Sequence, residues 1–219
     1  MRSLEAAAMR LKPAWAPSRG ALPRLWLFSD PLRLPDPRAA WATLPRGSGL
    51  VARGVSPALW PELARRRAGP LLLGAEPRAA LRHHAGLHWP DRPATAALLP
   101  FLRARRAGAP WALLTVAAHG PAGLRRARRL RADLVFLSPI FATPSHPGAA
   151  ALGPWRWAAL ARRAGRPVAA LGGITAHTAA RVPPQACGLA AITALLRAGH
   201  SVSMKSRNPP AEHCPHSFR

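Results

Sequence analysis

Short apolar runs alternate with stretches of helical character along most of the chain. The apolar runs predict strands, because they are continuous and are bounded by Pro, Gly or charged residues; they lie at 25–30, 49–55, 70–75, 86–90, 112–118, 134–139, 167–173 and 188–192. The Ala-, Leu- and Arg-rich stretches between them predict helices at 57–67, 76–84, 95–106, 121–131 and 155–165. Pro100 should kink the third of these helices or move its start.

The alternation predicts the fold class. Continuously apolar strands separated by helices indicate a parallel sheet that is covered on both faces. Eight such repeats predict an α/β fold, a closed (β/α)8 TIM barrel in a single domain. An open doubly wound sheet is the alternative, but no Gly-x-Gly-x-x-Gly motif follows the first predicted strand.

Both ends of the chain lack this alternation. Residues 1–22 are predicted to form a flexible leader, because Arg2, Glu5 and Arg10 interrupt any signal-peptide core. Residues 200–219 have no apolar period and are predicted to be a disordered tail. The barrel is therefore assigned to residues 23–199.

The chain is strongly basic, with a formal net charge of +24 that comes almost entirely from arginine. This balance favours anionic partners such as nucleic acid, acidic lipid or phosphorylated metabolites. Most arginines fall in predicted helices, as at 65–67, where a solvated outer face is the simpler interpretation. The eight tryptophans do not form the pattern of aromatics interleaved along a basic groove, so nucleic-acid binding is not favoured.

Membrane insertion and secretion are not indicated. No apolar run reaches the roughly 18 to 20 residues of a membrane span. The two cysteines, Cys187 and Cys214, have neither metal-site spacing nor an even disulfide framework. A cytoplasmic location fits this cysteine usage.

The candidate chemistry follows the predicted strands, because (β/α)8 barrels build their sites from the loops at the C-terminal strand ends. The loop after the sixth strand, "SPIFATPSHPG", contains Ser138, Thr143, Ser145 and His146. Hydroxyls and an imidazole suit a phosphate or pyrophosphate group. A proline-stiffened loop with incidental polarity is the alternative.

Two further strand ends carry candidate groups. Gly172 and Gly173 follow the seventh strand, where backbone N–H groups can approach an anion closely; a plain tight turn is the alternative. His119 follows the fifth strand and suits proton transfer near neutral pH, or could cap the next helix. His88, after the fourth strand and beside Trp89, fits a structural role better.

Charged residues near the predicted mouth are few. Arg53 lies within the second predicted strand and should face the mouth and meet an anion or a carboxylate. Asp30 and Asp91 follow strands, whereas Glu76 begins a helix. Magnesium needs oxygen ligands, and the predicted mouth has few carboxylates that could supply them.

The motifs "DLVFLSPIFATPSHPGAAALG" and "RPVAALGGIT" resemble the thiamine phosphate synthase/TenI superfamily, as do "GLHWPD", "TVAAHGPAGLRRA" and "GLAAITALL", over roughly residues 23–198. The resemblance implies a (β/α)8 barrel that joins hydroxymethylpyrimidine pyrophosphate to thiazole phosphate with help from Mg²⁺. It implies that Thr143 and Ser145 contact substrate phosphates and that Gly172 and Gly173 cradle the thiazole phosphate. Arg53 matches a basic position of the family.

The sequence departs from the synthase pattern where a metal would bind. Gly74-Ala75 replaces the family's Asn-Asp, Pro93 falls near its second metal aspartate, and only Asp91 lies close to the expected ion. His146 replaces a lysine and Ala117 a serine.

Three functions therefore stay open. The first is pyrimidine–thiazole coupling by a synthase. The second is a TenI-like, metal-independent thiazole tautomerase with His119 as its catalytic histidine. The third is a non-catalytic barrel that binds a phosphorylated ligand.

Overall fold

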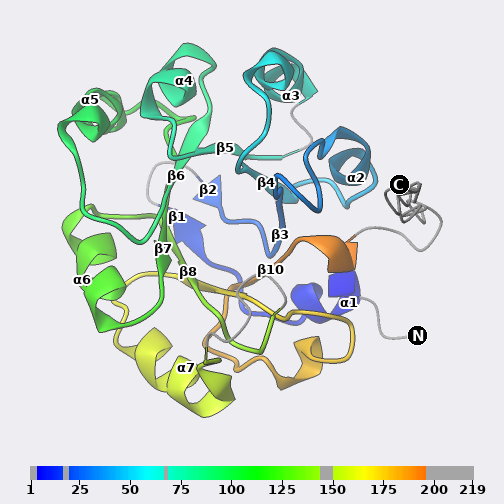
Figure 1. Cartoon of the computed structure of the whole chain (residues 1–219). Helices are drawn as coiled ribbons and strands as arrows, with labels where there is room; N and C mark the ends of the chain where they lie inside the picture. The colour runs from blue at the N-terminus through cyan, green and yellow to red at the C-terminus, as the bar shows by residue number, and fades with distance from the viewer. Residues whose placement is uncertain (1–3, 17–19, 67–68, 144–149, 196–219) are drawn as a thin grey trace, which may run out of the picture.

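Eight parallel strands form a closed barrel at the centre of the molecule (Figure 1). The computed structural model describes residues 4–16, 20–66, 69–143 and 150–195. The strands pair in chain order and β10 closes the ring against β3. They are β3 (Leu25–Phe28), β4 (Gly49–Ala52), β5 (Leu71–Gly74), β6 (Gly86–Trp89), β7 (Leu114–Ala118), β8 (Leu134–Leu137), β9 (Val168–Leu171) and β10 (Gly188–Ala191). The predicted TIM barrel is confirmed, although each strand is shorter than its apolar run.

Helices cover the outside of the barrel in sequence order, as the colour gradient of Figure 1 shows. They are α2 (Arg38–Ala42), α3 (Trp60–Arg66), α4 (Pro77–Arg82), α5 (Leu99–Arg106), α6 (Pro121–Arg129) and α7 (Gly153–Arg162). Two of them follow 3₁₀ turns, η1 (Pro57–Leu59) before α3 and η2 (Ala96–Leu98) before α5. Pro100 lies in the first turn of α5, so it sets the start of that helix, as predicted. Within the described residues, β9 and β10 are followed only by the 3₁₀ turns η3 (Ala179–Arg181) and η4 (Thr193–Leu195).

Alternate residues of each strand belong to two separate apolar layers. Trp26, Phe28, Val51 and Phe136 belong to the smaller cluster, which fills the barrel. Their neighbours, such as Leu27, belong to the larger cluster between barrel and helices. Successive strand residues point to opposite faces, and both faces are buried here, which explains the continuous apolar runs.

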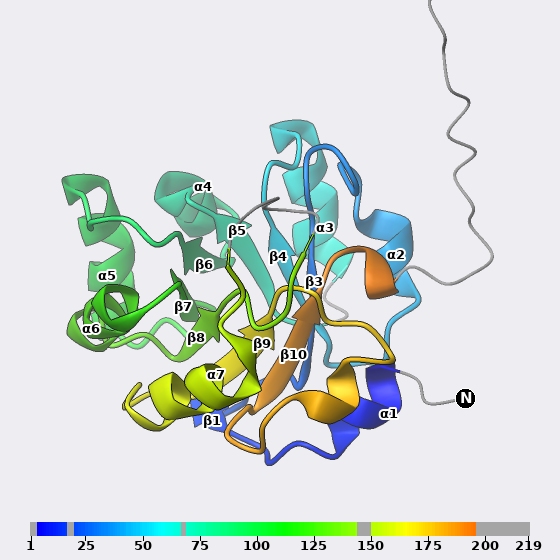
Figure 2. The ribbon, with the colours of Figure 1, turned by 60° about the horizontal axis from the view of Figure 1, so that its bottom comes forward.

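The N-terminal segment folds against the barrel. The helix α1 (Leu4–Met9) buries Leu4 and Ala8, and it lies beside η3 in Figures 1 and 2. The strands β1 (Trp15–Ala16) and β2 (Gly20–Ala21) form a small antiparallel pair. Within the predicted leader, residues 1–22, the described helix α1 thus packs on the barrel through its apolar face. The predicted tail, residues 200–219, lies outside the described residues.

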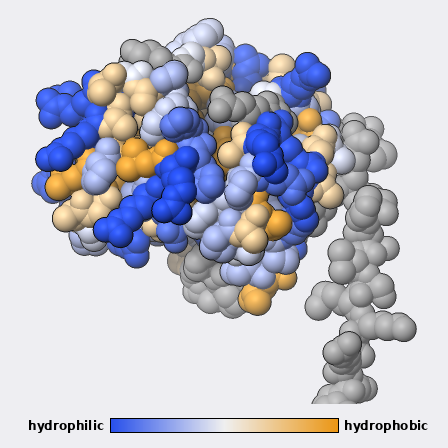
Figure 3. All heavy atoms as spheres, turned by 90° about the horizontal axis from the view of Figure 1, so that it is seen from above, coloured by the Kyte–Doolittle hydropathy of each residue, from blue (hydrophilic) through white to orange (hydrophobic). Residues whose placement is uncertain are grey.

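Figure 3 shows one face of the molecule, on which hydrophilic side chains lie in several clusters separated by smaller hydrophobic areas. None of the helices that the structure describes has the length and apolar character needed to cross a membrane.

Candidate functional site at the C-terminal mouth of the barrel

A cavity of about 800 Å³ opens at the C-terminal ends of the barrel strands. The structure brings seven predicted site residues to its lining, from the loops after five different strands: Arg53, Asp91, His119, Ser138, Thr143, Gly172 and Gly173. Ser145 and His146 lie outside the described residues. The tertiary fold thus gathers polar groups that are up to 120 positions apart (173 − 53) in the sequence.

His119 is held at both its backbone and its ring. It follows β7 directly, and its backbone N–H donates to Oδ2 of Asp91 at 2.8 Å. Its ring Nδ1 lies 2.9 Å from the carbonyl oxygen of Ser138, at the end of β8. The Ser138 hydroxyl lies farther from Nδ1, at 3.3 Å. A carbonyl only accepts hydrogen bonds, so a neutral ring that carries its proton on Nδ1 satisfies the closer contact and has its lone pair on Nε2. His119 is exposed and lines the cavity, so it can exchange a proton with a bound ligand.

Arg53 is the first residue after β4, not part of the strand as predicted, because strand pairing ends at Ala52. Its side chain meets the carboxylate of Asp30, with Nη2 3.0 Å from Oδ2, as predicted for a charge at this position. Its backbone N–H donates to the hydroxyl of Ser29 at 2.6 Å. These contacts fix a guanidinium at the edge of the cavity.

Arg33 also lines the cavity and was not among the predicted site residues. It binds the same Asp30 carboxylate, with Nη2 2.9 Å from Oδ2, and donates its backbone N–H to Oδ1 at 3.1 Å. Hydrogen bonds from Arg33, partly opposed by burial, hold the pKa of Asp30 well below its usual range. Two guanidinium groups thus share one carboxylate, which leaves a net positive charge for an anionic ligand. Arg33 lies three residues after Asp30, which ends the first predicted strand, and this position was the signal in the sequence that could have identified it.

The Gly172-Gly173 turn packs tightly against the loop after β8. The backbone φ angles of the two glycines are +96° and +65°, a region that side chains rarely adopt. A Cβ on Gly173 would lie 2.4 Å from the carbonyl oxygen of Ala142. The N–H of Phe141 donates to the carbonyl of Gly172 at 3.1 Å, so the two loops form one wall. Close packing therefore explains the glycines by itself.

His88 lies inside β6 and within the barrel, not after the strand as predicted. Its Nδ1 lies 2.9 Å from the hydroxyl of Thr115, and its ring packs edge-on against Phe28 and Phe136. Burial, and secondarily the charge of Arg53, lowers its pKa to about 3. His88 is thus a neutral group in the cavity floor.

The carboxylates at the mouth do not fit a magnesium ion. Asp30 is bonded to two arginines, and Asp91 is bonded to Arg126 and to the N–H of His119. Gly74 and Ala75, which also line the cavity, carry no oxygen side chain. Among the described residues, no three His, Cys, Asp or Glu side chains are grouped to hold a metal.

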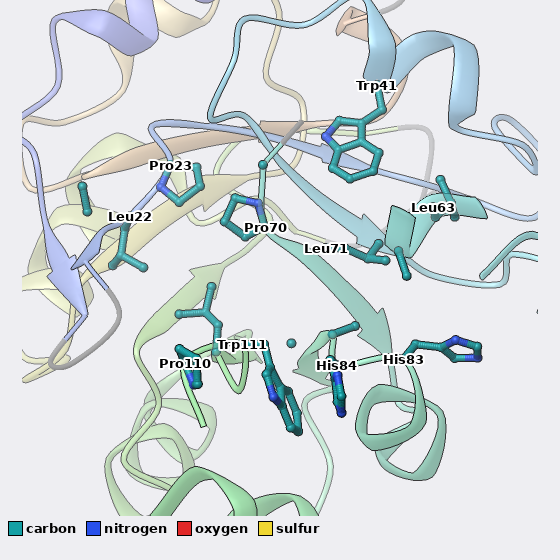
Figure 4. A pocket seen from close by; sticks show the side chains of 16 residues that line it. Leu22, Pro23, Trp41, Leu63, Pro70, Leu71, His83, His84, Pro110 and Trp111 are labelled. Atoms are coloured by element: carbon teal, nitrogen blue, oxygen red, sulfur yellow. The ribbon is translucent and has the colours of Figure 1, made fainter. Parts of the chain in front are cut away.

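A second, smaller cavity of about 210 Å³ lies at the opposite end of the barrel (Figure 4). Its lining includes Trp41, Trp111 and His84, and the last two rings stack with centroids 5.2 Å apart. It includes residues that precede strands, such as Pro70 before β5. Barrel chemistry belongs to the C-terminal strand ends, so we assign the functional site to the larger cavity.

The fold and the larger cavity define a (β/α)8 barrel whose mouth is lined by arginine and histidine side chains. A model of the family described as "Thiamine monophosphate synthase" matches residues 59–195, which is more than half of the chain. The chain therefore belongs to the thiamine monophosphate synthase family.

Comparison with solved structures supports the fold. Thiamine phosphate pyrophosphorylase from Pyrococcus furiosus is 17% identical with a TM-score of 0.60, covering 78% of this chain and 85% of that one. The 2-keto-3-deoxy-6-phosphogluconate aldolase of Zymomonas mobilis, solved with 3-phosphoglycerate, is 15% identical with a TM-score of 0.52, covering 87% and 85%. No curated protein sequence matches the chain significantly.

Proposed function

We propose that this protein is an enzyme of thiamine biosynthesis that binds a thiazole phosphate in the larger cavity and moves a proton on its ring. The geometry of His119 carries this proposal. Nδ1 faces the carbonyl of Ser138, so Nε2 is the basic atom and belongs to an exposed ring in the cavity lining. Such a histidine can take a proton from one atom of the ring and return it to another, as in a metal-independent tautomerisation.

Anion binding supports the same proposal. The phosphate is placed at the Gly172-Gly173 turn, where backbone N–H groups would meet it without side chains in the way. A second anionic group of the ligand, such as a carboxylate, is placed at Arg33 and Arg53, whose charges exceed that of Asp30. Thr143 is a further proposed phosphate contact.

Coupling of hydroxymethylpyrimidine pyrophosphate to thiazole phosphate is the second candidate function. The family match over residues 59–195 favours it, and the arginine pair could receive the pyrophosphate. Against it stands the engagement of both mouth aspartates by arginine, because magnesium would need those oxygens.

Two assays on one preparation separate these functions. Tautomerisation of the thiazole carboxylate phosphate, unchanged by a chelator, is the expected result. Coupling activity that appears only with Mg²⁺ would replace the first candidate with the second. Phosphate-ligand binding without either reaction would identify a non-catalytic binding barrel.

A further inference from the structure

Asp91 connects three elements around the histidine of the cavity. It lies two residues beyond β6, and its carboxylate reaches the start of α6. Oδ2 accepts the backbone N–H of His119 at 2.8 Å, while Oδ1 pairs with the guanidinium of Arg126 on α6. The Asp91 and Arg126 side chains are only 15% and 21% exposed, so this pair is not a loose surface contact.

The N-terminus of α6 is shaped to receive this carboxylate. Gly120, which precedes the helix, has no side chain to cap it, and Asp91 supplies a negative charge from another loop. A Cβ on Gly123 would lie 2.8 Å from Oδ1 of Asp91, so the glycine leaves the space that the carboxylate needs. The start of α6 thus offers the Asp91 carboxylate both a favourable charge environment and the space that it occupies.

The contacts of Asp91 position His119, and they do not favour the binding of a cation. The residue is fixed at its backbone by Asp91 and at its ring by the carbonyl of Ser138, so Nε2 keeps one position in the mouth. Both carboxylate oxygens of Asp91 are engaged by donors, one of them positively charged. A divalent cation would have to displace that guanidinium and then meet its repulsion.

We propose that Asp91 is the positioning residue for His119, stabilised in that role by Arg126, and that it is not a metal ligand. This inference rests on the proposed function only where turnover is used as the readout. The geometric part stands on its own, because it concerns how the backbone of residue 119 is held.

Two variants separate positioning from metal binding. Asp91→Asn keeps an oxygen that can accept the His119 N–H, whereas Asp91→Ala removes it. Asp36→Ala is the matched control, because Asp36 forms a similar pair with Arg38 on the exposed surface, outside the cavity lining.

The first measurement is the backbone amide resonance of residue 119 in a ¹⁵N-labelled protein. We expect a large upfield proton shift in Asp91→Ala, a smaller one in Asp91→Asn and none in Asp36→Ala. An unchanged resonance in a folded Asp91→Ala protein would overturn the proposal, whether or not the enzyme turns over any substrate.

The second measurement adds Mn²⁺ and records paramagnetic broadening. We expect no selective broadening around residues 91 and 119; selective broadening that Asp91→Asn abolishes would overturn the proposal in favour of a metal site.

The third measurement is turnover of the thiazole substrate. Asp91→Ala should lower kcat by up to about 10²-fold with KM little changed, because a misplaced group costs about that much. Asp91→Asn should recover part of the loss. Equal losses in the two variants, with intact amide resonances, would contradict a positioning role. If wild-type protein has no activity, the proposed function fails, whereas the amide and Mn²⁺ measurements still decide the role of Asp91.

Discussion

The ring Nδ1 of His119 lies 2.9 Å from the carbonyl oxygen of Ser138, which joins the ends of β7 and β8 across the mouth of the barrel. The contact selects the tautomer with a basic Nε2. A histidine that only capped α6 would direct its ring to backbone amides of that helix. The observed partner instead favours a catalytic role.

Replacing His119 by Ala should lower proton transfer by about 10² to 10⁴-fold, the usual contribution of a general acid–base group. Binding of thiazole phosphate should persist, because the Gly172-Gly173 turn and the arginine pair are unchanged. Steady-state kinetics and calorimetric titration of the ligand test the two statements separately. Full tautomerase turnover in the variant would remove the catalytic assignment.

Replacing Gly173 by Val should weaken phosphate binding and destabilise the fold. The residue has φ of +65°, and a Cβ would approach the Ala142 carbonyl oxygen to 2.4 Å. Gly108→Val is the control, since Gly108 has φ of +85° but no atom within 4 Å of a built Cβ. The control should lose on the order of 1–3 kcal/mol of unfolding free energy from backbone strain alone. Urea unfolding should show a larger loss for Gly173→Val, and equal losses would contradict the close packing.

The stability of the protein should depend on pH through His88. Its pKa of about 3 in the folded protein lies below the value of 6.5 for an ordinary histidine. Between about pH 3 and pH 6.5, His88 is therefore protonated in the unfolded chain but not in the folded protein. The unfolding free energy keeps its full value above pH 6.5 and falls as the pH drops below it. The loss is at most about 1.4 kcal/mol per pH unit.

His88→Gln isolates this contribution, because glutamine does not titrate but can still hydrogen-bond the Thr115 hydroxyl. The slope of unfolding free energy against pH between 4 and 6 should be shallower in the variant. Equal slopes in the wild type and the variant would show that His88 is protonated in the folded protein as readily as in the unfolded chain, and would contradict the prediction.

Arg105 should be essential for stability. It binds the buried Asp133, with Nη2 2.8 Å from Oδ1, and Asp133 also accepts the N–H of Leu114 at 2.8 Å. Arg105→Met would leave that carboxylate buried without its charge partner, at a cost of about 3–5 kcal/mol. Arg103→Met, on the exposed face of the same helix, should change stability by less than about 0.5 kcal/mol. Chemical denaturation of the two variants makes the comparison, and similar midpoints would refute it.

The sequence by itself determined the barrel and most of the list of site residues. Both faces of every strand are buried, so the strands appear as continuous apolar runs that can be counted, and the fold class then places the chemistry after them. His119, Ser138 and Gly173 could be selected in this way because their position relative to a strand end is a local property.

Only the tertiary structure decided what these residues contact. Asp91 and Arg126 are 35 positions apart, and nothing local indicates that the carboxylate binds a guanidinium instead of an ion. Arg33 and Arg53 meet on Asp30 because β3 and β4 are neighbours, and His88 is neutral because its strand turns it into the barrel. The packing of α1 on the barrel was likewise decided only by the tertiary structure. Partners and solvent exclusion depend on distances across the fold, and hydropathy along the chain does not encode those distances.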